Sequence, residues 1–271
     1  MPGTSLRETC YVLKTIPIKE RDLVAVLFGE NKGKISAIAR NGVQSRRFGG
    51  CLDFFTASDF ELDTRTFKLS DFGDDTLVQM NSAQSKHTFK TLSKSIYKLS
   101  CASSLNELVL RAVPLHRPAP DLFKLFSNTL TALDENEEDL SVPALNAFIL
   151  KLTQWLGLQP ALTRCQVCSK PLHEVAENEV YPQTQSGGWT CLTCTRPEER
   201  RLDRPLLSKL IILDAYHSML HPIRKIKWSA TPNEHILLLE FLEQHLAYFV
   251  PGLDRAPLNS FKFLKSVLLP E

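Results

Sequence analysis

The chain has 271 residues, of which 43% are hydrophobic and 23% are charged, and its formal net charge is +2. This length is enough for about two domains, and the composition is that of an ordinary globular protein rather than a disordered, collagen-like or repetitive one. A net charge so close to zero excludes binding to nucleic acid through an overall basic composition, so any such binding requires local clusters of cations.

The sequence also indicates where the protein resides. The N-terminus lacks the apolar core of a signal peptide, and the apolar stretch at residues 236–250 is interrupted by Glu240, Glu243 and His245. Seven cysteines, an odd number, fit a reducing compartment better than a secreted disulfide framework. We therefore expect a cytoplasmic protein without a membrane segment.

The first part of the chain is predicted to be a small β-barrel. Short runs rich in β-branched and aromatic residues, separated by glycines and charged turns, occupy residues 9–16, 23–28, 34–39, 54–62 and 66–72. Such runs are typical of strands. Five short strands within residues 1–80 suit a closed barrel such as an OB-fold, although an SH3-like barrel fits the same pattern.

The remainder is predicted to be helical. From residue 82 onward the apolar residues recur at intervals of three and four, beginning with Phe89, Leu92, Ile96 and Leu99. Further helical patterns cover residues 121–133, 143–156, 205–220, 233–249 and 258–268, and the acidic segment 134–139 is predicted to be a solvated linker. The predicted fold is α+β: an OB-like barrel over residues 1–80, then a helical domain over 81–160 and 201–271, with residues 161–200 inserted into it.

The insertion carries two C-x-x-C pairs, Cys165 with Cys168 and Cys191 with Cys194, separated by twenty-two residues. This layout is typical of a zinc ribbon, in which four thiolates on two tight knuckles complete a tetrahedron. A thioredoxin-like redox pair, a disulfide pair and a catalytic zinc are the alternatives. A redox motif needs a βαβ context, and a catalytic zinc needs an open coordination position. We predict one structural zinc ion, with lost metal or oxidised cysteines as the other possibility.

Cations are concentrated in three places. Five lie between residues 32 and 47 without an intervening acidic residue: Lys32, Lys34, Arg40, Arg46 and Arg47. On a barrel they predict a groove for phosphates, with Phe48 and Tyr11 as the nearest candidates for base stacking. The alternative is a solubilising turn beside an acidic strand region, with Phe48 in the barrel core.

The second group recurs every four residues, which predicts one face of a helix: Lys86, Lys90, Lys94 and Lys98. It suits either solvent or a polyanion. A third group suits the rim of a pocket for an acidic peptide, although Trp228 also fits a partly buried structural role: Arg224, Lys225, Lys227 and Trp228. No nucleotide-binding or hydrolase motif is present, which argues against an enzyme.

Three stretches resemble the RecO family of bacterial recombination mediators. The first runs from Tyr11 to the Gly49-Gly50 pair. The second reads A-F-I-L-K-L-T-Q-W-L-G-L-Q-P-A-L-T-R-C-Q-V-C and is followed by Y-P-Q-T-Q-S-G-G-W-T-C-L-T-C. The third consists of L-L-E-F-L-E-Q-H-L and S-F-K-F-L-K-S near the end of the chain. Together they span nearly the whole chain. One departure is Asn41, which stands between Arg40 and Gly42 where the family tends to have a basic residue directly before glycine.

The resemblance implies a non-enzymatic protein of DNA repair and homologous recombination. Such a protein binds single- and double-stranded DNA without sequence specificity and anneals complementary strands. It works with RecR and with the acidic C-terminal tail of the single-stranded DNA-binding protein, so that the RecA recombinase loads onto coated gaps. The alternative function is a zinc-stapled adaptor that docks a protein partner and does not contact DNA.

Overall fold

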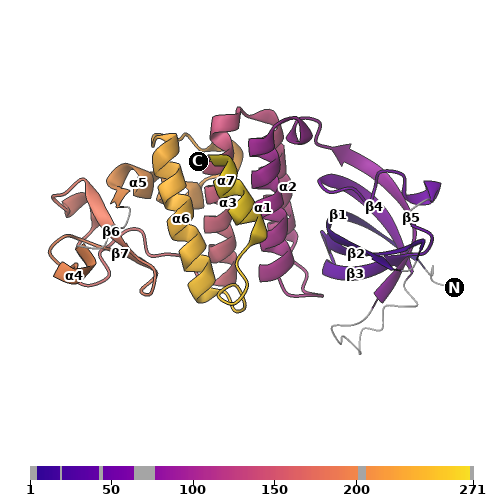
Figure 1. Cartoon of the computed structure of the whole chain (residues 1–271), viewed down its shortest axis with the longest axis horizontal. Coiled ribbons are helices and arrows are strands. Elements are labelled where there is room, and N and C mark those ends of the chain that lie inside the picture. Colours follow the sequence, from indigo (N-terminus) through magenta and orange to yellow (C-terminus); the bar gives the residue numbers. More distant parts are fainter. Residues whose placement is uncertain (1–4, 19, 43–44, 64–76, 201–205, 269–271) are drawn as a thin grey trace. The chain divides into compact units, whose positions relative to one another are not determined.

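The computed structural model describes residues 5–18, 20–42, 45–63, 77–200 and 206–268 (Figure 1). The chain forms two compact units, Met1–Asp134 and Glu135–Glu271. The predicted boundary at residue 80 therefore differs from the division between the units, because the first helices pack on the strands that precede them. Within the described residues, no helix is both long enough and apolar enough to cross a lipid bilayer.

Five strands of the first unit close into a barrel in the order β1-β2-β3-β5-β4, with a parallel β3–β5 pair among otherwise antiparallel pairs. The strands are β1 (Ser5–Ile18), β2 (Asp22–Gly29), β3 (Gly33–Ala39), β4 (Thr56–Asp63) and β5 (Leu77–Thr88). Alternate residues such as Ala25, Leu27, Ile35 and Ala37 fill the interior. A five-stranded N-terminal sheet in an α+β protein is thus confirmed, and four of the five predicted strands match; the predicted strand at 66–72 lies outside the described residues.

The helix predicted from residue 82 onward is wrong. Residues up to Thr88 belong to β5, which pairs with β4 from Leu62↔Met80 to Thr56↔Thr88. Consequently the four lysines do not share a helix face: Lys86 lies in β5, Lys90 in a bend, Lys94 in a short 3-10 helix, and Lys98 is buried in α1 (Ile96–Ala112). The helix starts only at Ile96, because the hydroxyl of Ser95 accepts the N–H of Lys98 and caps the first turn.

Aromatic side chains join the barrel to α2 (Pro120–Glu135). The ring of Tyr11 lies 5.4 Å from that of Phe123 and 5.1 Å from that of Phe126, and its hydroxyl is 2.8 Å from Ser127 Oγ. Tyr11 is therefore buried, and so is Phe48, which packs inside the barrel. Neither ring is available for stacking on a base, which corrects that prediction.

The second unit combines helices with a small sheet. The helices are α3 (Ser141–Leu156), α4 (Pro197–Arg200), α5 (Lys209–Leu220), α6 (Pro232–Phe249) and α7 (Asn259–Leu268); the sheet has the order β7-β6-β8, from β6 (Glu179–Gln183), β7 (Gly188–Thr190) and β8 (Leu207–Ser208). Buried on nearly every side, α3 packs against both α5 and α6. Gly157, in the left-handed conformation, ends α3, and a capping box between Thr231 and Glu234 begins α6. The long predicted helices of this unit are confirmed.

Candidate metal centre and nucleic-acid interface

Two knuckles bring the four predicted cysteines together. In the first, the N–H of Ser169 donates to the carbonyl of Cys165 at 3.0 Å; in the second, the N–H groups of Cys194 and Thr195 both donate to the carbonyl of Cys191 at 3.0 Å. Such tight turns leave the two sulfurs of each C-x-x-C pair on the same side of the backbone. The spacing seen in the sequence is therefore enough to form each half of the site.

The geometry of the four sulfurs fits a tetrahedral metal site. Their ligand atoms all lie within 4.8 Å of one another, and the sulfurs of Cys168 and Cys191 are 3.8 Å apart. A tetrahedron with zinc–sulfur bonds of about 2.3 Å has edges of about 3.8 Å. Four thiolates at these distances can hold one metal ion in a closed coordination shell.

Local hydrogen bonds oppose the cost of burying thiolates. Burial works against ionisation of the Cys165 thiol, but backbone N–H groups of Cys168, Cys191 and Val167 outweigh it and lower its pKa to about 6. Burial likewise opposes ionisation of Cys191, and the hydroxyl of Thr193, 3.1 Å from its sulfur, helps to lower the pKa. Hydrogen bonding to the sulfurs of Cys191 and Cys168 raises the pKa of Cys194 to about 12. Ionisation of Cys165 and Cys191 thus opposes ionisation of Cys194, and a bound cation would stabilise all of these thiolates together.

The hairpin beside the cysteines is fixed by close packing. Trp189 is fully buried, and its indole N–H donates to the carbonyl of Leu162 at 2.8 Å. The neighbouring Gly188 has no room for a side chain, because a Cβ there would lie 2.8 Å from the carbonyl oxygen of Ala161. This packing holds β7, and with it Cys191, in place against the first knuckle.

Three of the predicted barrel cations gather at one end of β3. Arg40, Arg46 and Arg47 are all exposed, and the guanidinium of Arg47 donates to the carbonyl of Arg40 at 3.0 Å. A second donor of Arg47 reaches Ser45 Oγ at 3.2 Å, within the turn that begins the short 3-10 helix Arg46–Phe48, so the bond to Arg40 is the one that ties this helix to the end of β3. The arrangement places three exposed arginine residues at the same end of the barrel.

Two lysines of the same sequence cluster lie elsewhere. Lys34 is only 7% exposed, and its Nζ donates to the carbonyl of Leu110 in α1 at 2.5 Å. Lys32 is half-buried and lies in the turn before β3, whereas Arg40 comes directly after the end of β3. At the usual rise of a strand, the backbones of Lys32 and Arg40 are about 26 Å apart. The prediction that all five cations share one surface is therefore wrong. The length of β3 separates Lys32 from the three arginines, and Lys34 is buried against α1.

Sequence reasoning missed Arg21. The β2–β3 register pairs Leu23 with Ala39, and the N–H of Asn41 donates to Asp22 Oδ1 at 2.9 Å, so the exposed Arg21 lies at the same end of the barrel as Arg40. The pairing of β2 with β3 is the signal that brings Arg21 and Arg40 to the same end of the barrel. We call Arg21, Arg40, Arg46 and Arg47 the arginine cluster.

The later lysines are dispersed in the first unit. The ammonium of Lys86 lies 3.3 Å from Asp59 Oδ1 and donates to Thr9 Oγ1 at 3.1 Å, so much of its charge is balanced within β1 and β4. Lys90 and Lys94 are exposed. Because they lie outside β5, they do not continue the row that the sequence predicted.

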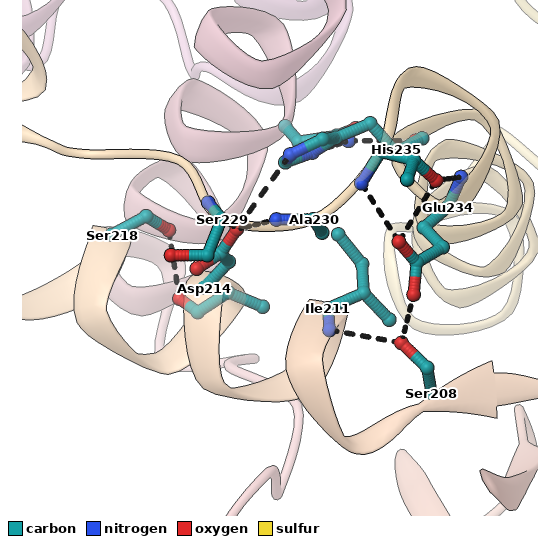
Figure 2. A network of polar contacts seen from close by, with 11 residues as sticks. Ser208, Ile211, Asp214, Ser218, Ser229, Ala230, Glu234 and His235 are labelled. Atoms are coloured by element: carbon teal, nitrogen blue, oxygen red, sulfur yellow. Dashed lines mark hydrogen bonds and ion pairs between the residues drawn. The ribbon is translucent and has the colours of Figure 1, made fainter. Parts of the chain in front are cut away.

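A polar network in the second unit holds the loop that carries Arg224 to Trp228. Asp214 Oδ2 accepts the N–H groups of Ser229 at 2.7 Å and Ala230 at 2.8 Å, and lies 3.9 Å from His235 Nε2, as Figure 2 shows. Burial lowers the pKa of His235 to about 4, so the ring is neutral near pH 7. The carboxylate thus anchors the loop at the start of α6.

The loop's own side chains are mostly exposed. Arg224 is paired with Glu135 at 3.1 Å, while Lys225 and Lys227 face solvent. Trp228 is half-buried, with its ring edge-on to that of His235 at 5.2 Å. The three cations and the indole are therefore close in sequence and accessible, but Trp228 also has the structural role considered from the sequence.

Comparison with known proteins places the chain in a family. Residues 1–80 match the family model described as Recombination protein O N terminal, and residues 93–251 match Recombination protein O C terminal. A DNA repair protein RecO from Anaeromyxobacter sp. (strain K) is 33% identical over 195 residues, 72% of each chain. Another, from Alkaliphilus metalliredigens (strain QYMF), is 28% identical over 259 residues, which cover 95% of this chain and 97% of that protein. The chain belongs to the recombination protein O family of DNA repair proteins.

Proposed function

We propose that this protein is a non-enzymatic mediator of DNA repair and homologous recombination. It binds single- and double-stranded DNA without sequence specificity, anneals complementary strands and helps to load RecA on gaps coated by the single-stranded DNA-binding protein. RecR and the acidic tail of that protein are its proposed partners, and it acts in the cytoplasm, at the nucleoid. Family membership and the chemistry of the barrel surface support this function.

The arginine cluster is the observation that carries the proposal. Exposed guanidinium groups at one end of a closed five-stranded barrel can follow a phosphate backbone while leaving base edges unread. We interpret the barrel as an OB-fold, an architecture that commonly binds oligonucleotides. Because neither Tyr11 nor Phe48 is exposed, the proposed binding relies on charge more than on stacking.

The four cysteines are proposed to hold one structural zinc ion. A closed shell of four thiolates leaves no position for a substrate, so the metal would stabilise the hairpin rather than take part in a reaction. The acidic tail is proposed to bind beside Lys225, Lys227 and the exposed part of Trp228, because two exposed lysines precede a partly exposed aromatic residue in this loop.

The test is oligonucleotide binding by fluorescence anisotropy at increasing salt. In the triple variant Arg40→Ala, Arg46→Ala, Arg47→Ala, affinity for all sequences should fall, and the slope of log affinity against log salt should become shallower by about 2 on single strands. Replacing Lys124, Arg255 and Lys262, which are also exposed, by alanine is the control with the same change in net charge.

Equal losses in both triple variants would show that only net charge matters and that the arginine cluster is not the binding surface. Binding that is absent or independent of salt in the unaltered protein would favour the adaptor without DNA contact. A double variant Lys90→Ala, Lys94→Ala shows whether the DNA path continues beyond the barrel.

A further inference from the structure

A groove of about 940 Å³ runs across the second unit, between the β6–β7 hairpin and the C-terminal half of α6. Residues 182–185 form one wall, and the other includes Phe241, Tyr248 and Val250. The hydroxyl of Thr184 lies 3.1 Å from Gln244 Oε1 and links the two walls. The groove is therefore bounded by parts of the chain that are held together.

The charge of the groove has one sign. Carboxylates of Glu199, Glu240 and Asp254 line it, and among the described residues it has no lysine, arginine or histidine side chain in its lining. Between these carboxylates lie apolar surfaces, and Tyr248 is 58% exposed at the rim. Such a surface repels phosphate, so it is not part of a nucleic-acid path.

The groove continues past α6 into a second depression. This smaller depression, of about 230 Å³, shares Gln244, Ala247 and Asp254 with the groove and extends to Pro257 and Leu258. Two connected depressions, the larger lined by both polar and apolar groups and the smaller mainly apolar, suit an extended chain with several side chains better than one compact small molecule.

We propose that this groove binds an extended segment of a partner protein in which lysine or arginine residues alternate with large apolar residues. The cations pair with Glu240 and Asp254, and the apolar side chains pack against Tyr248 and Phe249, which line the groove and are not buried. The carboxylates favour such a segment over a neutral one, and the attraction is strongest at Glu240, which is half-buried, whereas Asp254 is exposed. This site is separate from the proposed DNA-binding surface and does not depend on it.

The probe is a pair of immobilised octapeptide arrays, applied to the full-length, metal-loaded protein. In one array, lysine or arginine alternates with leucine, phenylalanine or tryptophan in varied order; in the other, glutamate or aspartate replaces each basic residue. The basic array should retain the protein and the acidic array should not. The strongest basic peptide, carrying a fluorophore, then gives a dissociation constant by anisotropy.

Variants localise the binding. The double variant Glu240→Lys, Asp254→Lys should bind the labelled peptide about tenfold or more weakly, and Tyr248→Ala should weaken it severalfold. The double variant Glu137→Lys, Asp139→Lys changes the net charge equally at exposed residues outside the groove lining, and it should bind like the unaltered protein. Circular dichroism establishes that each variant is folded.

Three results would overturn the proposal: equal retention on both arrays, equal loss of affinity in the two charge-reversal variants, or self-association of the protein that the Glu240→Lys, Asp254→Lys variant abolishes. The last would assign the groove to a second copy of this chain. Oligonucleotide affinity of this variant should not decrease, whereas it should decrease in the arginine-cluster variant. Failure of one proposal is therefore distinguishable from failure of the other.

Discussion

The ammonium group of Lys34 is enclosed by the first unit rather than offered to a ligand. Its hydrogen bond to the carbonyl of Leu110 lies near the C-terminal end of α1, where the helix dipole favours a cation. The adjoining backbone is also held, because the N–H of His116 donates to the carbonyl of Lys34 at 2.7 Å. Lys34 thus connects β3 to the end of the helix.

Lys34→Met should separate stability from DNA binding. The change keeps an apolar stem of similar length but removes the donor, so the free energy of unfolding should fall by about 1–2 kcal/mol. Affinity for oligonucleotides should stay the same, because the charge is buried. Urea unfolding and anisotropy titrations measure the two quantities. A weakened affinity with unchanged stability would restore Lys34 to the binding surface.

His235 should make the second unit sensitive to mild acid. Its folded pKa of about 4 lies below the ordinary value of 6.5, because burial disfavours the charged ring. The unfolded chain therefore binds the proton more readily, and the stabilising contribution present above pH 6.5 is lost as the pH falls toward 4. The loss amounts to about 3 kcal/mol for this residue.

Denaturant unfolding between pH 7 and pH 4, followed by tryptophan fluorescence, checks this expectation. All three tryptophans, Trp155, Trp189 and Trp228, belong to the second unit. The pH dependence should be shallower in His235→Gln, whatever its stability at pH 7, and unchanged in His173→Gln, whose side chain is exposed. Identical pH dependence in all three proteins would show that the charge state of His235 does not matter.

Among the elements, the cysteine hairpin should depend on its metal. Chelation should lower the stability of the second unit by several kcal/mol, because metal binding in small structural sites contributes apparent folding free energy on the order of 10 kcal/mol. Mass spectrometry of protein prepared without chelator should give one zinc per chain. Cys168→Ser should reproduce the effect, whereas Val167→Ser, at an exposed position on the same knuckle, should not. Protein with well under one metal per chain and full stability would contradict the assignment.

The elements also show which features a sequence can predict. The cysteine knuckles were predictable because each depends on four consecutive residues, and the long helices because their apolar periodicity extends over several turns. Strand β5 was not, because its polar run from Asn81 to Lys86 is extended only through pairing with β4. Burial of Lys34 depends on Leu110, 76 positions away, which no local pattern reveals.

For the whole molecule, the division into two units separates the proposed roles. The arginine cluster lies in Met1–Asp134, whereas the metal centre and the acidic groove both lie in Glu135–Glu271. A surface that attracts phosphate and a surface that repels it thus belong to different compact bodies. The nearly neutral total charge hid this contrast, because cations and carboxylates cancel in a sum but not on the separate surfaces.

The contact at Gly33 has an evolutionary consequence for the first of these bodies. A Cβ at this position would lie 1.9 Å from the carbonyl oxygen of Arg117, in the turn that follows α1. Only glycine fits at this position as long as the backbone of that turn keeps its present course. A larger residue at position 33 therefore requires a different backbone course at Arg117, so a change at one of these two places demands a change at the other.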